Sequence, residues 1–306
     1  MPAQGADSDE DVDRTVHSDC YCVAAGERTT RAMTTAPVTP EDVWSAFADV
    51  RRTTPLVQNI TNYVAMDVSA NVLLAAGASP AMVHAVPEAA EFTGITSALV
   101  VNIGTVSPPW AEAMNLAARV ADDRGIPWVF DPVAVGATAY RSSVATDLID
   151  ARPTIVRGNA SEILALARAV GVRSGGGGGR GVDSTDTADA ALDAATALAA
   201  HVGGVVAVTG AVDVVTDGSR TVRLAGGDEL ITRITAIGCS VSALVAAFAT
   251  TGEDRLVTTA AALAVMNVAV ERAAMDAPGP GTLRVRLIDE LHGLDEKAVR
   301  AGARIS

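Results

Sequence analysis

Short apolar runs alternate with longer amphipathic stretches along most of the chain. The runs are apolar on both faces, which is typical of parallel strands covered by helices. Strand candidates lie at 80–85, 98–105, 127–134, 154–159 and 204–210. Helix candidates lie at 66–76, 87–95, 109–124, 160–170, 186–201, 239–250, 256–275 and 284–300. The alternation predicts a single α/β domain with a mainly parallel sheet.

The alternation begins at Thr39, in "TPEDVWSAF", where a threonine N-cap precedes a proline and two acids. Residues 1–38 are polar, acidic and without periodicity, so we expect a disordered tail at 1–38 and one domain over 39–306. Asp217 and Gly218 separate two strand-like runs and predict a hairpin. We interpret the five glycines at 175–179 as a loop, and "GGDE" at 226–229 as a turn.

Composition and charge narrow the function classes. The 306 residues are 49% hydrophobic, enough for a large core, and the net charge is −13. This acidity argues against binding to nucleic acid or to anionic lipid, which needs basic patches. We expect no membrane span and no secretory signal, and three cysteines do not make a disulfide framework. The expected location is the cytoplasm.

Two scarcities limit the chemistry further. Lys297 is the single lysine, which argues against a P-loop and against a Schiff-base lysine. The four histidines lack ligand partners at the spacing of a zinc site, and we interpret His84 as a core residue or a pocket wall. Catalysis would therefore depend on carboxylates, arginine, backbone amides and the thiol of Cys239.

Polar residues gather where the predicted strands end, in "NIGT", "DPVAVGA", "RGNASE" and "VTG". Ligands of parallel sheets bind at this carboxyl edge. Asp131 could hold a metal or a substrate hydroxyl there, or simply begin an Asx turn before Pro132. The hydroxyl of Thr209 could reach a phosphate, or Thr209 could simply end its strand.

Asn159 and Glu162 stand three residues apart at a predicted helix start. Both offer oxygen atoms, which Mg²⁺ prefers. The same spacing is that of a capping box, in which the two side chains only close the helix. The spacing alone leaves both interpretations open, with the capping box slightly favoured.

Cys239 follows a glycine at the start of a helix of small apolar residues. Unpaired amides at such a start attract phosphate, and their field favours the thiolate. Free cysteine is also among the most buried residue types, so a packing role is equally open.

Several motifs together resemble the hydroxyethylthiazole kinase family. They are "PLVQNITNYVAMDVSANVLLAAGASPAM", "ALVVNIGT", "DPVAVGA", "RGNASEI", "GVDS", "VTGAVDVVTDG", "GC" and "GPGT", spread over roughly residues 45–285. The resemblance implies a three-layer ribokinase-like fold and ATP-dependent phosphorylation of the hydroxyl of 4-methyl-5-(2-hydroxyethyl)thiazole in thiamine salvage. It also implies Mg²⁺ and a homotrimer with active sites between subunits.

Carried over by motif, the family's residues fall on positions of this chain. The resemblance implies that Arg157 and Thr209 bind ATP and that Asp131 and Glu162 serve Mg²⁺. It places Cys239 where ribokinase relatives keep an aspartate base, so Cys239 is the candidate proton acceptor for the substrate hydroxyl.

The substrate side carries over with two departures. The resemblance implies that Met82 lines the thiazole pocket and that Ala236 faces the thiazole. The family usually has glycine at the position of Ala236 and often a glutamate at that of Ala211. These departures keep a non-catalytic binding paralogue open as an alternative, beside another ribokinase-like vitamin kinase.

Overall fold

The computed structural model describes residues 36–172 and 184–306, with the side chains of 184–190 left out. The predicted tail, apart from 36–38, and the five-glycine loop lie outside the described residues, so the predicted domain boundary stays a prediction. Val38 is buried among core residues.

A nine-stranded sheet runs through the described domain in the order β2-β1-β3-β4-β5-β6-β7-β8-β9. Its first six strands are parallel, which confirms the predicted mainly parallel sheet. The parallel strands are β1 (Leu56–Ile60), β2 (Ser79–Ala81), β3 (Ala98–Asn102), β4 (Trp128–Asp131), β5 (Ile155–Asn159) and β6 (Val205–Thr209). The antiparallel strands are β7 (Val212–Thr216), β8 (Thr221–Ala225) and β9 (Arg304–Ile305), and β7 and β8 form the hairpin predicted at Asp217 and Gly218.

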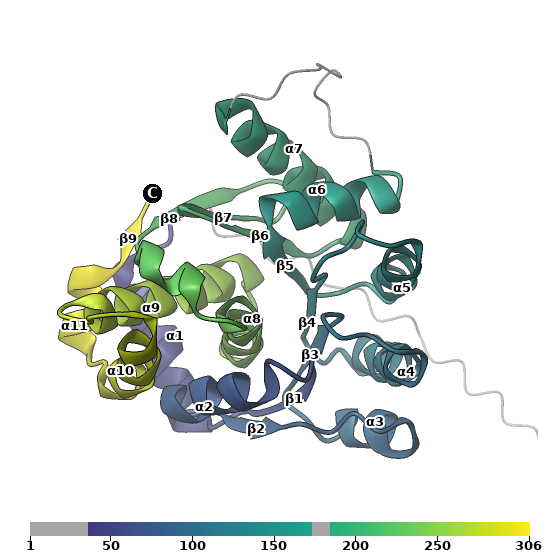
Figure 1. Cartoon of the computed structure of the whole chain (residues 1–306), viewed down its shortest axis with the longest axis horizontal. Coiled ribbons are helices and arrows are strands. Elements are labelled where there is room, and N and C mark those ends of the chain that lie inside the picture. The colour runs from purple at the N-terminus through teal and green to yellow at the C-terminus, as the bar shows by residue number, and fades with distance from the viewer. Residues whose placement is uncertain (1–35, 173–183) are drawn as a thin grey trace, which may run out of the picture. The chain divides into compact units, whose positions relative to one another are not determined.

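Helices cover both faces of the sheet and complete the three predicted layers (Figure 1). One face carries α1 (Pro40–Thr53), α2 (Met66–Ala76), α8 (Ile237–Phe248), α9 (Arg255–Ala274), α10 (Pro280–Gly293) and α11 (Glu296–Gly302). The other carries α3 (Val86–Thr93), α4 (Pro108–Arg124), α5 (Ala139–Ile149), α6 (Ala160–Ala169) and α7 (Ser184–Val202). Each helical layer buries its own apolar cluster against the strands, as expected for strands apolar on both faces.

Helices α8 and α9 form the middle of one helical layer. Small residues fill both, so that nearly every position of α8 after Cys239 is buried. Helix α9 is long and apolar enough to cross a membrane by length and composition, but 78% of its apolar window is buried inside the protein. Burial of that kind is what a core helix shows.

Two strand predictions were incomplete. The candidate at 80–85 forms a strand only over Ser79–Ala81, because β2 is an edge strand that pairs with β1 at only three positions. Strand β1 itself was missed, because its buried residues Gln58 and Asn59 interrupt the apolar pattern. The amide of Gln58 donates to the carbonyls of Val83 and Ala89, which compensates for its burial.

Two helix predictions also needed correction. The single helix expected at 284–300 is two helices, α10 and α11, because the chain turns after Gly293 and Asp295 caps a new helix by accepting from Ala298 N. Helix α5 was missed. Thr138 caps it by accepting from the amide of Arg141.

A short 3-10 helix, η1 (Glu229–Arg233), begins at the last residue of the "GGDE" segment, with Asp228 as its N-cap. Gly226 and Gly227 have φ of 143° and 83°, so the predicted turn uses backbone conformations that favour glycine.

Candidate functional site

The carboxyl ends of β4, β5 and β6 meet the start of α8 around the guanidinium of Arg157. Nη1 of Arg157 donates to the carbonyl of Gly238 at 2.9 Å, and Nη2 donates to the hydroxyl of Thr209 at 2.6 Å. A side chain at Gly238 would meet Nη1 at 3.0 Å, so glycine is what permits this approach. Arg157 Nε has no partner in the described part of the chain.

Asp131 ends β4 with a carboxylate that is 1% exposed. Its Oδ2 accepts from the hydroxyl of Ser242 on α8 at 2.7 Å and lies 3.8 Å from Nη1 of Arg157. Its Oδ1 has no hydrogen-bond partner among the residues described. Burial raises the pKa of Asp131 to about 6, although Arg157 and Ser242 favour the charged form. The unpartnered oxygen is free to accept a proton donor or a cation.

Cys239 lies in the first turn of α8, half buried, with Sγ accepting from the amide of Asn62 at 3.3 Å. Burial raises the pKa of the thiol, and the negative charge of Asp131 raises it further. The expectation that the helix start favours the thiolate is therefore wrong for the free protein. Desolvation and a neighbouring carboxylate outweigh the field of the helix.

Glu162 forms the capping box that its spacing predicted. Oε2 accepts from the amide of Asn159 at 2.9 Å, and the side chain of Asn159 accepts from the amide of Glu162. The other oxygen, Oε1, accepts from the amide of Ala134 at 3.0 Å, in the loop that follows Asp131. The charge of Glu162 also contributes to the raised pKa of Asp131, so the two carboxylates lie within electrostatic reach of each other.

The described residues hold no cluster of three or more His, Cys, Asp or Glu side chains that would enclose a metal. Asp131 and Glu162 nevertheless suit Mg²⁺, which is commonly held by one or two carboxylates, several waters and substrate phosphates. The unpartnered Oδ1 of Asp131 is the observation that favours this fit. Both oxygens of Glu162 already accept backbone amides, which suits contact through water.

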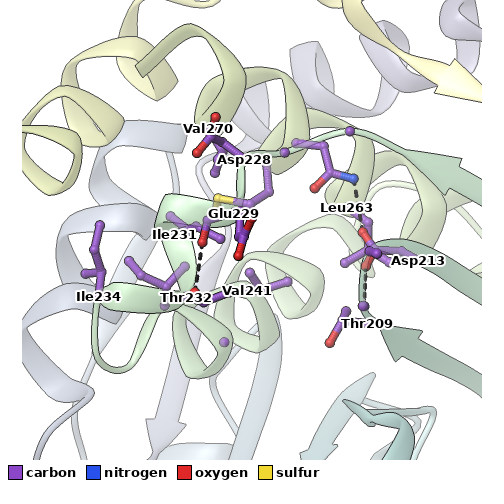
Figure 2. Close-up of a pocket in the computed structure, with 18 of the residues that line it drawn as sticks. Thr209, Asp213, Asp228, Glu229, Ile231, Thr232, Ile234, Val241, Leu263 and Val270 are labelled. Carbon is purple, nitrogen blue, oxygen red and sulfur yellow. Dashed lines mark hydrogen bonds between the residues drawn. The ribbon is translucent and has the colours of Figure 1, made fainter. Parts of the chain in front are cut away.

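A cavity of about 750 Å³ opens beside Arg157 and Thr209 (Figure 2). Most of its wall is apolar and comes from η1, α8 and α9. The wall residues include Ile231, Ile234, Val241, Leu263, Met266 and Val270. Asp213 and Asn267 add polar groups near Thr209, and Gly226 and Gly227 contribute backbone. Apolar walls with a few placed polar groups are typical of small-molecule sites.

The substrate-side predictions fall at the same edge of the sheet but outside this cavity wall. Met82 directly follows β2, two strands away from β3 in the sheet order, and its carbonyl lies 3.0 Å from Nδ1 of His84. The ring of His84 stacks on Trp110 at 4.1 Å between centroids, in agreement with the interpretation of His84 as a pocket wall or core residue. Ala236 precedes α8 with φ of 62°, a left-handed conformation.

Sequence reasoning missed several polar residues that hold the site together. Arg141 of α5 donates to the carbonyls of Ile103, Gly104 and Val133, so it links the loops after β3 and β4. The others are Asn62, Asn102, Ser242, Asp213 and Asn267. Asn102 belonged to "NIGT", which was noted for its polar residues. Asn62 and Asp213 lay in motifs that carry the family resemblance, whereas Ser242 and Asn267 lie within apolar runs and gave no signal.

Comparison with known proteins decides the family. The family model described as the hydroxyethylthiazole kinase family matches residues 47–297. This chain belongs to that family. A hydroxyethylthiazole kinase of Rhizobium etli is 54% identical over 258 residues, covering 84% of this chain and 98% of the relative. One of Cereibacter sphaeroides is also 54% identical, covering 84% of this chain and 95% of the relative.

Solved structures agree with this assignment. The hydroxyethylthiazole kinase of Pyrococcus horikoshii is 37% identical, with a TM-score of 0.79 and coverage of 87% of this chain and 98% of that one. The pyridoxal kinase of Staphylococcus aureus, solved with AMP-PCP and pyridoxal, is 14% identical with a TM-score of 0.52, and covers 71% of this chain and 88% of its own. The second likeness concerns the fold alone and agrees with the predicted ribokinase-like architecture.

Proposed function

We propose that this member of the family transfers the terminal phosphoryl group of ATP to the hydroxyl of 4-methyl-5-(2-hydroxyethyl)thiazole. The observation that carries the proposal is the forked guanidinium of Arg157, which bonds the hydroxyl of Thr209 and the carbonyl of Gly238 at the start of α8, in the wall of a largely apolar cavity. Phosphoryl transfer depends mainly on charge neutralisation and alignment, which this arrangement supplies without a lysine.

The polar and apolar parts of the cavity favour one orientation of ATP. Its phosphates belong beside Arg157, Thr209 and the amides of the first turn of α8, because an uncapped helix start attracts anions. Its flat base belongs against the apolar wall that η1 and α9 provide. The relatives named as kinases, and a kinase of the same fold solved with AMP-PCP, support ATP as the co-substrate.

Mg²⁺ belongs at Asp131, with Glu162 acting through water. The ion would offset the phosphate charges and the negative charge of Asp131 when it is bound. Without it, the carboxylate of Asp131 is buried with a pKa of about 6 and one unpartnered oxygen. We infer that the positive charge of Arg157 alone does not offset the negative charges of Asp131 and of the bound phosphates of ATP.

Cys239 is the proposed acceptor of the hydroxyl proton. The bond between the terminal phosphorus and its bridging oxygen breaks, the substrate oxygen bonds to that phosphorus, and the proton passes to the sulfur. The raised pKa of the thiol means that only a small fraction is thiolate at neutral pH. A loose transition state asks little of the base until late in transfer, so a small fraction suffices.

The thiazole alcohol belongs on the other side of Cys239, where Met82 and Ala236 are its proposed contacts. The thiazole is flat and uncharged, and an adaptable methionine suits such a ring. Asn62 donates to both Sγ of Cys239 and Oδ1 of Asn102, so hydrogen bonds hold these three side chains in place on the thiazole side of Cys239.

A homotrimer is part of the proposal. Large apolar side chains are exposed on or beside α2 and on α10, two helices that pack against each other: Tyr63, Val64, Leu74 and Val285. Contiguous exposed apolar side chains mark association surfaces, and we infer that these four belong to one such surface. Light scattering with size-exclusion chromatography should give a mass of about three chains, and a monomer would refute this part.

We also propose that the enzyme is located in the cytoplasm.

The test is ADP release that depends on the thiazole alcohol. The enzyme should turn over with ATP and the thiazole alcohol, and hydroxymethylpyrimidine should be a poor substitute. Preference for the pyrimidine would favour another vitamin kinase. Tight ATP binding without turnover on either alcohol would favour a non-catalytic paralogue.

A further inference from the structure

Asp213 is a buried carboxylate that the proposed reaction does not use. It stands on β7, only 7% exposed, on the same face as Val215, which is fully buried. That face packs on α9 in an otherwise apolar cluster. Burial raises the pKa of Asp213, which shows that the charged form is poorly solvated there. A carboxylate in such a place needs specific partners to be tolerated.

The two oxygens of Asp213 bind two different parts of the chain. Oδ1 accepts from the amide of Gly210 at 3.0 Å, across the short connection between β6 and β7. Oδ2 accepts from Nδ2 of Asn267 on α9, also at 3.0 Å. The side chain therefore ties the Gly210–Ala211 connection to α9.

This connection directly follows Thr209, which the proposed ATP site uses. The hydroxyl of Thr209 accepts from Arg157, and Arg157 in turn donates to the carbonyl of Gly238 on α8. Asp213, Asn267, Thr209, Arg157 and Gly238 all line the same cavity. The hydrogen bonds of Asp213 (Figure 2) join α9 to the connection that follows Thr209 in the chain, and the hydrogen bonds of Arg157 join Thr209 to the start of α8.

A purely structural role for Asp213 would predict a pair placed away from the ligand site. The pair instead lies at the cavity wall, next to the connection that directly follows Thr209 in the chain. Gly226 approaches the same place on α9, since a side chain there would come within 3.0 Å of Cβ of Asn267. The wall is closely packed at this point, so a shift of the connection would displace Thr209 and the fork of Arg157.

We propose that Asp213 is a positioning residue for the nucleotide. Together with Asn267 it holds the Gly210–Ala211 connection against α9, so that Thr209 and Arg157 keep one orientation toward the phosphates. The proposal rests on the proposed function, because it assumes that the cavity receives ATP.

Four variants test it by steady-state kinetics and by calorimetric titration with a non-hydrolysable ATP analogue and Mg²⁺. Asp213→Ala leaves the amides of Gly210 and Asn267 without acceptors. It should raise the KM for ATP and the Kd of the analogue by about tenfold or more, with the KM for the thiazole alcohol unchanged within about twofold. Asp213→Asn keeps an acceptor for Gly210 and can pair with a rotated Asn267 amide, so it should stay within about threefold of the wild type.

The last two variants, a single change at Asn267 and an exchange of the two residues, test the pair itself. Asn267→Asp alone places two carboxylates together and should raise the Kd of the analogue by about tenfold. Asp213→Asn combined with Asn267→Asp restores the hydrogen bond and should recover most of the lost affinity. This pair keeps the test decisive where Asp213→Ala does not fold.

Several results would overturn the proposal. One is an unchanged KM for ATP and Kd in Asp213→Ala. Another is an Asp213→Asn variant that binds the analogue as weakly as Asp213→Ala does, which would show that the charge of Asp213 matters and not the placement of its hydrogen bonds. A third is a double exchange that does not recover the lost affinity.

Two outcomes for the wild type separate this proposal from the proposed function. A wild type that binds the analogue without phosphorylating thiazole alcohol refutes the proposed function alone, and the Kd values still decide this proposal. A wild type that does not bind the analogue refutes both.

Discussion

Two of the helices that begin at the carboxyl edge of the sheet, α6 and α8, have first turns that are built in opposite ways. Helix α6 is closed by Asn159 and Glu162, which exchange hydrogen bonds with each other's backbone. Helix α8 begins after Ala236 in a left-handed conformation, and within the described residues no side chain caps it. Arg157 reaches its start but donates to a carbonyl, so the first amides of α8 stay available.

The difference teaches where an anion can bind. The amides at a helix start carry partial positive charge, but a carboxylate that already accepts from them cancels it. At α6 the negative side chain of Glu162 is part of the protein, so this start favours a cation nearby. At α8 the positions that would attract a phosphate are free and face Arg157. The two starts therefore suit the metal and the phosphates respectively.

The largest expected effect is at the open start. Cys239→Ser should fold normally but lose about 10² to 10⁴-fold in kcat, or a little less, because serine packs similarly and hardly ionises. Cys239→Asp should stay active, since a carboxylate accepts the same proton. Measured kcat and Tm of both variants check this. A serine variant at full speed together with an unfolded aspartate variant would show that Cys239 only packs.

The raised pKa of Cys239 adds a pH signature to the same pair of variants. A base must be deprotonated, and a raised pKa moves the thiolate to higher pH, so kcat of the wild type should still be rising at a pH where an ordinary thiol is already half ionised. The aspartate variant should reach its plateau at lower pH, because a carboxylate ionises earlier. Identical profiles for the two proteins would place the titrating group elsewhere.

Arg157→Lys tests the contact between the fork and the open start. Lysine offers a single ammonium, which does not span the carbonyl of Gly238 and the hydroxyl of Thr209 together. We expect the KM for ATP to rise about tenfold to a hundredfold, with a smaller change in the KM for the thiazole alcohol. Steady-state kinetics with each substrate varied in turn measure this. An unchanged ATP dependence would place the nucleotide away from Arg157.

Glu162→Gln tests the closed start. Glutamine supplies one carbonyl oxygen where Glu162 accepts from both Asn159 and Ala134, so unfolding free energy should fall by about 1 kcal/mol. Activity should fall by more than about tenfold, with a higher Mg²⁺ requirement, if the charge also serves the ion. Denaturant unfolding measures the change in stability, and Mg²⁺ titrations of kcat measure the changes in activity and in Mg²⁺ requirement.

A matched control exists in a second capping box of this protein. Thr39 and Asp42 form the same reciprocal pair at the start of α1. Asp42→Asn should lose stability of a similar size without any change in kinetics or Mg²⁺ requirement. If Glu162→Gln behaves like Asp42→Asn, Glu162 is only a cap.

The sequence predicted the layered fold well, because strands covered on both faces are uniformly apolar and stand out, as at β3 and β6. It missed β1, where Gln58 and Asn59 are buried by forming hydrogen bonds that no sequence pattern reveals. The capping box at Asn159 was predictable because its partners are three residues apart.

Partners far apart in sequence were not predictable. Ser242 is one of many small residues on α8, and only the fold places its hydroxyl 2.7 Å from Asp131, more than a hundred residues earlier. The ionisation of Cys239 was mispredicted for the same reason. The helix start is visible in the sequence, whereas the burial and the neighbouring carboxylate that outweigh it come from tertiary packing.

The smallest expected effect concerns Ala236, which sets the geometry of the open start. Its φ of 62° costs an alanine about 1 to 2 kcal/mol, whereas glycine adopts it freely. Ala236→Gly relieves that strain but gives back about 0.4 to 1 kcal/mol through a more flexible unfolded chain, so Tm should rise only slightly. Losing the methyl should also widen the alcohol site and lower the KM for the thiazole alcohol by about a few fold, because an extra methyl in a close-packed site costs free energy, while the KM for ATP stays the same. Thr54→Gly is the matched control, because Thr54 has φ of 47° at the end of α1. It should shift Tm in the same direction without changing either KM. If Ala236→Gly changes the KM for ATP instead, Ala236 faces the phosphates and not the thiazole.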